Sequence, residues 1–474
     1  MDAMSSGCRP LVYVYDLPTG YQQDGKLQHA ESPLGLAVTP PAMLDPTTRL
    51  YSAVVYGTGA ALFGRVRQYH CTTRDPSAAD LFFVPAFTAR LPSSHAFCAE
   101  APRHQPHNCS RRRLFNRINA LRNDLGTSYL RRRNGRDHIL PTGHQGVQLS
   151  GSWPYYELHI TDPRLGEASI LGTEENVPSI PHWPAKARPS PRFISVPWSS
   201  SVHVAADAKW HQAPWRQKLK RMVLIGAAFG FRGHSKALTF PLRAGLYYSC
   251  VNHPRSVCTY LKLAPRLTQA QADRSVHKEV TAIAALYYNS TFCLQPLGDG
   301  PTRAGIIDAL LLGCIPVLFH PAQLKQWPRH WGSWGRNATV LLDVERYKYT
   351  RPPKPRNGSA TAKHISTPQV HGGRQDIVAT LLAIPPERVA HMQHTIRSHA
   401  HCVHYFDTHA SARDDGTEEI AASRVQLEGS IAGAKSRIGS EYDAFDIAIR
   451  AAWRRARRLP EPPPEMGDCR PIIS

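Results

Sequence analysis

The chain has 474 residues, 42% of them hydrophobic, and a formal net charge of +21 at pH 7. This length excludes a single small core and predicts two cored domains. The charge suits anionic partners such as nucleotide sugars, acidic polysaccharides, membrane headgroups or nucleic acids, although a solvated basic surface is the commoner explanation.

Residues 10–180 alternate strand-like runs with helical patterns, which indicates an α/β unit. Strands are predicted over residues 11–15, 81–87 and 137–140, and helices over residues 60–69 and 114–130. Basic triplets flank the second helix, and we interpret them as its two ends rather than as a nucleic-acid-binding arm. We therefore expect no nucleic-acid partner.

Residues 181–214 are rich in proline and serine and suit an interdomain connection. Residues 215–410 repeat the alternation and end in a helix near residues 386–402, with an exposed insertion expected at residues 351–374. Residues 411–474 form a C-terminal segment with one amphipathic helix that we expect to lie across the first half. The apolar face of that helix comprises Tyr442, Phe445, Ile449 and Trp453.

Residues 290–319 carry the strongest functional pattern in the chain. A strand at 292–295 runs into a Gly/Pro loop, a helix begins near Thr302 and stops at Gly313, and a strand follows at 314–319. Such loops hold phosphate groups in α/β proteins, because loop amides donate and the helix dipole favours negative charge. Arg303 adds a positive charge that suits a diphosphate. A tight helix–sheet contact would need the same small residues, so the pattern alone leaves both readings open.

Asp308 lies about a turn further along the same helix. The small residues Ala304 and Gly305 precede it and leave room for a sugar ring. The Asp308 carboxylate would accept hydrogen bonds from the ribose hydroxyls. Asp299 lies inside the loop, where an aspartate next to a helix start is more often a cap than a metal ligand.

The string from Phe292 to Val317 closely resembles the signature of the exostosin family of inverting glycosyltransferases. The shared features are a Phe-Cys-Leu strand, a Pro-x-Gly loop, an acidic helix residue and Gly-Cys-Ile-Pro-Val. The form Cys-Leu-Gln-Pro-x-Gly-Asp followed by Thr-Arg is most similar to the plant branch that contains xyloglucan galactosyltransferases. Further family-like motifs occur in the expected order at residues 12–18, 75–85, 134–138 and 221–226.

The resemblance implies the GT-B architecture, an α/β fold with two facing Rossmann-like domains and a cleft between them. The first domain would face a polysaccharide or glycan acceptor, and the second would bind a UDP-sugar, with galactose as the first choice. Crevices at the carboxyl ends of strands in open α/β sheets give such a cleft an independent rationale. Two alternatives stay open: another UDP-sugar (xylose, arabinose, glucuronate or galacturonate), or a non-catalytic basic glycan-binding protein.

An inverting transfer needs a base for the acceptor hydroxyl and positive charge for the departing diphosphate. Arg303 and the loop amides can meet the second need without a metal, and no cofactor is expected. The predicted donor-binding residues are Gly298, Asp299, Gly300, Thr302, Arg303 and Asp308.

The base should come from the first domain, and the candidates are Asp137, His138 and His144. An Asp-His pair at a strand start is more often structural. Many family members carry His-Asp where this chain has His144-Gln145, which leaves the base unassigned.

The ten cysteines indicate an oxidising compartment. Cys293 and Cys314 begin adjacent strands, so a bridge between them is plausible, and Cys250–Cys258 and Cys98–Cys109 are further candidate pairs. Buried free thiols are the alternative. Glycosylation sequons agree with a secretory route; they occur at Asn108, Asn289, Asn337 and Asn357.

The N-terminus contains no apolar run suited to a signal peptide or membrane anchor. Members of the resembled family are usually anchored in the Golgi membrane and work in its lumen. We therefore expect a Golgi enzyme and a truncated sequence, with a missing exon or a non-secreted protein as alternatives.

Two side-chain groups receive a lower weight. Trp327, Trp331 and Trp334 present flat apolar faces that could line a sugar groove, although core packing is the commoner role. His401 and His404 lie beside Cys402 at a spacing that could hold a metal, against the default of a satisfied helix surface.

Overall fold

The computed structural model describes residues 8–16, 35–44, 48–53, 57–85, 127–142, 166–175, 190–204, 212–231, 239–263, 269–298, 300–349, 375–406, 443–463 and 466–471. Some predictions lie outside these residues: those on His144, Asp299, the Cys98–Cys109 pair, Tyr442, the insertion at 351–374 and most of the helix at 114–130.

The first half of the chain forms a six-stranded sheet in the order β4-β1-β5-β6-β7-β8, with every pair of neighbours parallel. Its strands are β1 (Val12–Val14), β4 (Thr72–Thr73), β5 (Leu81–Phe83), β6 (His138–Pro141), β7 (Ser169–Gly172) and β8 (Phe193–Ser195). Helices α1 (Thr58–Val66) and α4 (Thr127–Arg131) belong to the same half. The central strands are buried throughout, as expected for a parallel sheet covered on both faces. The strands predicted near residues 11–15, 81–87 and 137–140 are confirmed.

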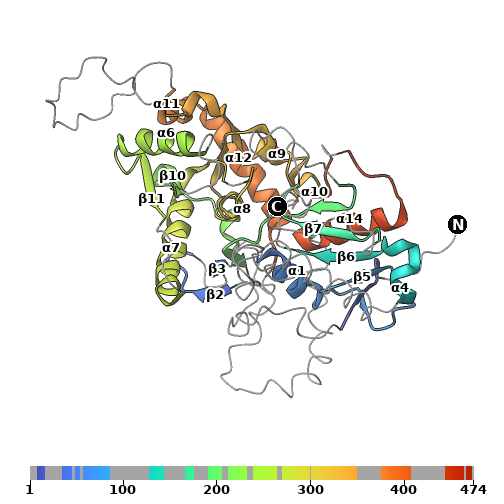
Figure 1. Cartoon of the computed structure of the whole chain (residues 1–474). Coiled ribbons are helices and arrows are strands. Elements are labelled where there is room, and N and C mark those ends of the chain that lie inside the picture. Colours follow the sequence, from blue (N-terminus) through green and yellow to red (C-terminus); the bar gives the residue numbers. More distant parts are fainter. Residues whose placement is uncertain are drawn as a thin grey trace, which may run out of the picture.

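The second half forms a five-stranded parallel sheet in the order β11-β10-β12-β13-β14, of which β10 and β11 are labelled in Figure 1. Its strands are β10 (Val223–Phe229), β11 (Cys258–Lys262), β12 (Ser290–Gln295), β13 (Ile315–Leu318) and β14 (Val340–Leu341). The longer helices are α6 (Thr239–Val251), α7 (Gln269–Asn289), α8 (Ala304–Leu311) and α12 (Pro386–His399), and the shorter ones are α9 (Pro321–Leu324), α10 (Pro328–Trp331) and α11 (Ile377–Leu382). Two parallel sheets with helices are consistent with two Rossmann-like units.

A small antiparallel sheet joins the halves. It consists of β2 (Gly35–Val38), β3 (Thr48–Ala53) and β9 (Val202–Val204). Val38, Leu50 and Val202 are buried in the core of the second half, although the first two belong to the N-terminal part of the sequence. The connection predicted at 181–214 therefore contributes two strands to the packed structure, β8 to the six-stranded sheet and β9 to the antiparallel one.

The C-terminal helix α14 (Ala444–Arg457) packs on the first half, as its amphipathic pattern predicts (Figure 1). Phe445 and Ile449 belong to the same core cluster as Val12 and Leu62. Asp443 caps the helix and accepts a 2.6 Å hydrogen bond from the buried Arg65 guanidinium of α1. A charge-assisted pair thus fixes the helix at its N-terminus.

Two of the predicted disulfides are confirmed. Cys293–Cys314 joins β12 to the residue before β13 with the Cα atoms 6.0 Å apart, and Cys250–Cys258 joins α6 to β11. Cys8–Cys71 and Cys402–Cys469 are additional bridges between distant segments. Within the described part of the chain no cysteine is free, which supports an oxidising compartment.

The three tryptophans belong to the hydrophobic core, which is the commoner role named above. Trp327, Trp331 and Trp334 are each at most 2% exposed, so none is available to stack on a sugar in a groove. Their indole nitrogens donate to main-chain carbonyl oxygens.

The default prediction, which placed His401 and His404 on a helix surface, is wrong. Both histidines are buried, and the sulfur of Cys402 is bridged to Cys469, which removes the thiolate that a metal would need.

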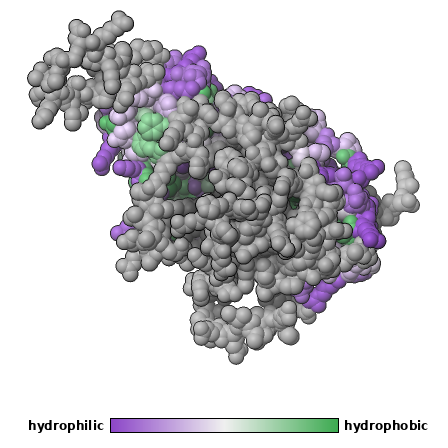
Figure 2. All heavy atoms as spheres, viewed as in Figure 1, coloured by the Kyte–Doolittle hydropathy of each residue, from purple (hydrophilic) through white to green (hydrophobic). Residues whose placement is uncertain are grey.

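The described surface that is visible in Figure 2 is largely hydrophilic, with small apolar areas near α6. Phe240 and Val251 of that helix are 49% and 47% exposed. Among the helices of the described ranges, none combines the length and the apolar character that crossing a bilayer requires.

Candidate functional site

The loop between β12 and α8 has the geometry of an anion-binding turn. Arg303 is the N-cap of α8 in an extended backbone conformation. The amides of Ala304 and Gly305 therefore open the helix and have no acceptor within it. The helix dipole places positive potential at the same point. The Gly298 amide is already used, because it donates to the Gly300 carbonyl at 3.1 Å and closes the loop on itself.

Arg303 provides the strongest sign that this turn receives a ligand. Its Nη2 donates to the Ala228 carbonyl at the end of β10, at 3.0 Å. Its Nη1 is buried and has no hydrogen-bond partner among the described residues. A buried charged donor without an acceptor is costly, so an oxyanion at Nη1 would satisfy it.

Gly305 supports both readings of the small residues in this helix. A Cβ at Gly305 would lie 2.8 Å from Oε1 of Gln295 and 3.5 Å from Nε of Arg303. A side chain there would collide with the sheet and crowd the guanidinium. The glycine therefore serves close packing and also keeps the space beside Arg303 open.

Arg243 of α6 is a second cation at the loop, and the sequence patterns did not single it out. Its guanidinium donates to the Leu297 carbonyl at 2.7 and 3.2 Å and to the Gly230 carbonyl at 2.6 Å. It thereby ties the loop after β12 to the loop after β10. The only sequence signal was an arginine within a mostly apolar helix.

Glu174, directly after β7, joins the first half to the loop of the second. Its carboxylate is fully buried, and Oε1 accepts the Thr302 amide at 2.6 Å and the Thr302 hydroxyl at 2.5 Å. The indole of Trp198 donates to the same hydroxyl at 2.9 Å. Thr302, which the sequence assigned to donor binding, thus contacts the first half in this structure.

The carboxyl ends of strands from the two sheets meet at this point. The indole of Trp327, which follows β13, donates to the Thr173 carbonyl beyond the end of β7 at 2.6 Å. The side chain of Gln326 bonds to both the amide (2.7 Å) and the carbonyl (3.3 Å) of Glu175. The site is therefore built at the edge where open α/β sheets place their ligands.

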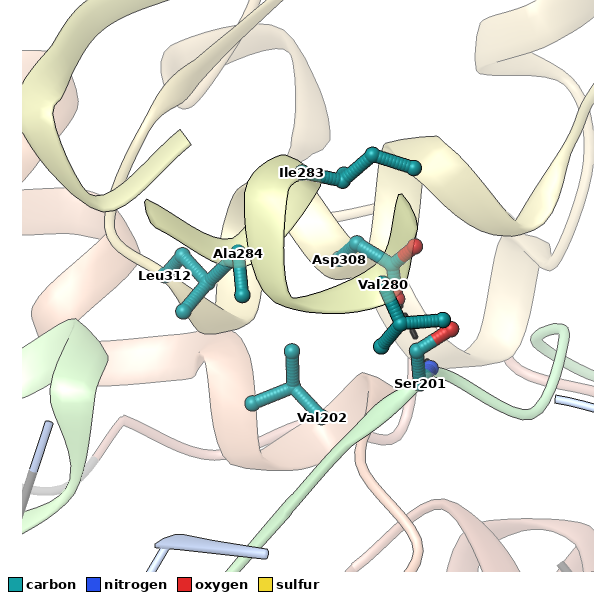
Figure 3. Close-up of a pocket in the computed structure, with 7 residues that line it drawn as sticks. All are labelled: Ser201, Val202, Val280, Ile283, Ala284, Asp308 and Leu312. Carbon is teal, nitrogen blue, oxygen red and sulfur yellow. Dashed lines mark hydrogen bonds between the residues drawn. The ribbon is translucent and has the colours of Figure 1, made fainter. Parts of the chain in front are cut away.

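Asp308 is buried and already hydrogen-bonded. Its Oδ1 accepts the Ser200 hydroxyl at 2.5 Å and the Ser201 amide at 2.9 Å. Burial raises the pKa of Asp308, and these two hydrogen bonds oppose the rise. Asp308 and Ser201, joined by a hydrogen bond in Figure 3, both line a cavity of about 10 Å³. That volume holds about one water molecule, so a ribose does not fit in this cavity. Contact between Asp308 and a ribose stays a prediction.

Asp137 and His138 lie at the amino end of β6, and both are fully buried. Asp137 accepts Nε of Arg132 at 2.9 Å and lies 3.0 Å from Nδ1 of His138. Burial alone would raise the pKa of Asp137, but the contacts with His138 and Arg132 outweigh it and lower the pKa. Nε2 of His138 lies 3.0 Å from the Tyr15 hydroxyl. The network is a satisfied buried cluster of the kind that structural Asp-His pairs form.

Strand register separates this cluster from the loop of the second half. Ile139 pairs with Ser169 at the start of β7, whereas Glu174 lies beyond the end of that strand. An extended chain rises about 3.3 Å per residue, so Asp137 and Glu174 are roughly 20 Å apart along the strand direction. The catalytic roles of Asp137, His138 and His144 stay predictions.

Glu175 is an acidic residue at the correct edge that the sequence patterns did not single out. Burial raises the pKa of Glu175, and the positive charge of Arg329 opposes the rise. The side chain is only partly exposed, and Gln326 holds its backbone in place. A carboxyl group with a raised pKa is suited to general-base work. Its sequence signal was a pair of glutamates directly after an apolar strand.

Comparison with known proteins gives a family and several relatives. The model of the Exostosin GT47 domain matches residues 7–332. The probable xyloglucan galactosyltransferase GT17 of Arabidopsis thaliana is 27% identical over 356 residues, covering 70% of this chain and 69% of its own length. The xyloglucan galactosyltransferase MUR3 of the same plant is 22% identical over 421 residues, covering 86% of this chain and 54% of its own length. The xyloglucan-specific galacturonosyltransferase 1, also from Arabidopsis thaliana, is 30% identical over 163 residues, covering 33% of this chain and 22% of its own length.

Proposed function

Because the chain belongs to the exostosin GT47 family of inverting, UDP-sugar-dependent glycosyltransferases, we propose that it transfers galactose from UDP-galactose to a hydroxyl of a polysaccharide or glycan. The observation that carries the donor site is the buried Nη1 of Arg303, which has no partner among the described residues and lies at the N-terminus of α8. The relatives named as xyloglucan galactosyltransferases support galactose and make xyloglucan the first acceptor to test.

We place the donor in a GT-B cleft between an acceptor-side domain at residues 10–180 and a nucleotide-sugar domain at residues 215–410. The two parallel sheets support two units, with β8 (Phe193–Ser195) extending the first sheet beyond residue 180, and the bonds at Glu174 and Trp327 join their carboxyl edges. The disulfides support an oxidising compartment, and the Golgi lumen is the one we propose.

In the proposed reaction the leaving UDP carries the charge that develops as its bond to the sugar breaks. Arg303 Nη1 and the amides of Ala304 and Gly305 receive that charge on the diphosphate oxygens. Arg243 and Glu174 hold the loop in place, so the donors are positioned before the reaction begins. A base removes the proton from the acceptor hydroxyl. At the same time the hydroxyl oxygen attacks the anomeric carbon from the face opposite the diphosphate.

Glu175 is our first choice for the base, and Asp137, His138 and His144 are retained as the alternatives. The reason is location, since Glu175 lies at the same edge as the loop. We expect Glu175→Gln to lower turnover by a hundredfold or more while UDP still raises the melting temperature, because a general base contributes on that scale. Asp137→Asn should instead lower the unliganded melting temperature. The assignment is wrong if Glu175→Gln retains full turnover.

The transferase proposal is tested with purified protein and a panel of UDP-sugars, by measuring UDP release with and without xyloglucan oligosaccharides. We expect UDP-galactose to give the fastest release and the oligosaccharide to stimulate it. The 30% identity to a galacturonosyltransferase over 163 residues makes UDP-galacturonate the second candidate. If UDP raises the melting temperature but the protein turns over none of the UDP-sugars, a non-catalytic glycan-binding protein is supported instead.

A further inference from the structure

A cavity of about 300 Å³ lies at the amino edge of the second sheet, opposite the donor loop. Its walls come from the segment that leads into β10 and from α12. Arg221 precedes β10 and Gly313 precedes β13, whereas the donor loop follows the carboxyl end of β12. The cavity is therefore separate from the proposed active site.

The lining of the cavity is polar and positively charged. Lys218, Arg221 and Arg397 line it, and no acidic side chain is among its lining residues in the described part of the chain. Next to them in sequence, Arg216 has a buried Nη1 without a hydrogen-bond partner among the described residues. The described residues that line the cavity therefore carry three positive charges and no negative one.

Arg221 builds the rigid wall of the cavity. Its guanidinium donates to the carbonyl oxygens of Tyr288 (2.5 Å), Leu312 (3.1 Å) and Gly313 (2.9 Å). Gly313 has a φ of +70°, and a Cβ there would lie 2.6 Å from Nη2 of Arg221. Glycine is therefore required for the arginine to lie against the chain, and the positive charge is fixed by the fold.

The pKa values of two arginines that line the cavity are lowered, as expected for buried positive charges that lie close together without a negative one among the described lining residues. Burial, with a smaller contribution from the charge of Arg397, lowers the pKa of Arg221 to about 10. Burial also lowers the pKa of Arg397, with a contribution from the charge of Arg216. A bound anion would offset both effects, because an opposite charge favours the protonated form of each group.

Two glutamines indicate what the rest of the ligand carries. Gln217 and Gln393 line the same cavity, and Gln393 lies one helical turn before Arg397 on α12. A side-chain amide both donates and accepts, which matches sugar hydroxyls. The volume is at the lower end of the range of about 300–1,000 Å³ for small-molecule pockets, larger than one inorganic ion needs.

We propose that this cavity binds an acidic sugar unit, with the carboxylate of a uronic acid on Lys218 and Arg397 and its hydroxyls on Gln217 and Gln393. The shared chemistry is an oxyanion, which a uronic acid or inorganic sulfate could both supply. Binding at this cavity does not depend on the transferase activity.

The test compares galacturonate, galactose and sulfate at matched ionic strength, by calorimetric titration and by the shift in melting temperature. We expect galacturonate to bind and galactose not to bind. Arg397→Gln should weaken galacturonate binding on the order of tenfold, as the loss of one charge-assisted hydrogen bond implies. Arg388→Gln, on an exposed part of the same helix, is the matched control and should bind as the wild type does. Arg303→Ala should also bind normally, which separates this cavity from the donor loop.

Lys218→Gln is the second variant, because Lys218 is exposed and its replacement leaves the core intact. It should also weaken galacturonate binding, whatever the stability of Arg397→Gln. Sulfate that binds as tightly as galacturonate would overturn the sugar assignment and leave an inorganic oxyanion site. The proposal fails altogether if no anion binds the wild type, or if Lys218→Gln and Arg397→Gln bind galacturonate unchanged.

Discussion

Replacing Arg303 by alanine is expected to lower turnover by about a hundredfold or more, the scale seen when one preorganised charge-stabilising donor is removed. The reason is the position of its buried Nη1 at the N-terminus of α8, where the departing diphosphate would lie. The stabilisation of the protein by UDP should also be lost. The unliganded melting temperature should change little, because the side chain is only half-buried and its hydrogen bond to the Ala228 carbonyl is replaceable by water.

Two controls make the Arg303 experiment specific. Arg303→Lys keeps the charge but loses the planar fork, so its turnover should fall between the two extremes. Excess EDTA should leave the wild-type rate nearly unchanged, since Arg303 and the helix N-terminus already supply positive potential. If EDTA silences the enzyme and manganese restores it, a metal carries the diphosphate and the role proposed for Arg303 is wrong.

Glu174→Ala is expected to destabilise the protein and to weaken UDP binding together. The change leaves the buried Thr302 amide and hydroxyl without their acceptor, at about 1–3 kcal/mol in the free energy of unfolding. Because Thr302 directly precedes Arg303, the phosphate-binding groups lose their fixed position, and we expect UDP affinity to fall at least tenfold. Denaturant unfolding and UDP titration of the same samples measure the two effects.

A double-mutant cycle with Thr302→Val isolates the hydrogen bond between Glu174 and the Thr302 hydroxyl, because valine keeps the amide that also donates to Glu174. A hydrogen bond to a charged group predicts a coupling of about 1.5–3 kcal/mol. Glu167→Ala is the matched control, because Glu167 precedes β7 at its opposite end and pairs with Arg455. It should leave the UDP response unchanged. Strictly additive effects of Glu174→Ala and Thr302→Val would show that the contact does not hold the loop.

Local sequence patterns were sufficient wherever neighbouring residues decide the structure. The alternation of apolar runs and glycine turns correctly predicts the strand–loop–helix–strand unit that becomes β12, α8 and β13. Cys293 lies within β12 and Cys314 directly precedes the neighbouring strand β13, so the same pattern made their pairing plausible. The apolar stripe of α14 predicts a buried face, and Phe445 and Ile449 lie in the first core. Periodicity and turn chemistry act within a few residues, and a sequence displays them directly.

By itself, the sequence determined the α/β class, the family signature and the position of Arg303 at a helix start. Only the tertiary structure decided which partners these residues have. Glu174 meets Thr302, and Asp308 meets Ser200, across more than a hundred residues of sequence. The same packing encloses Asp137 in a satisfied hydrogen-bond network. It also brings Lys218, Arg221 and Arg397 to one cavity, whose described lining residues include no acidic side chain. Partner choice depends on how whole sheets pack against one another, and no local pattern records that arrangement.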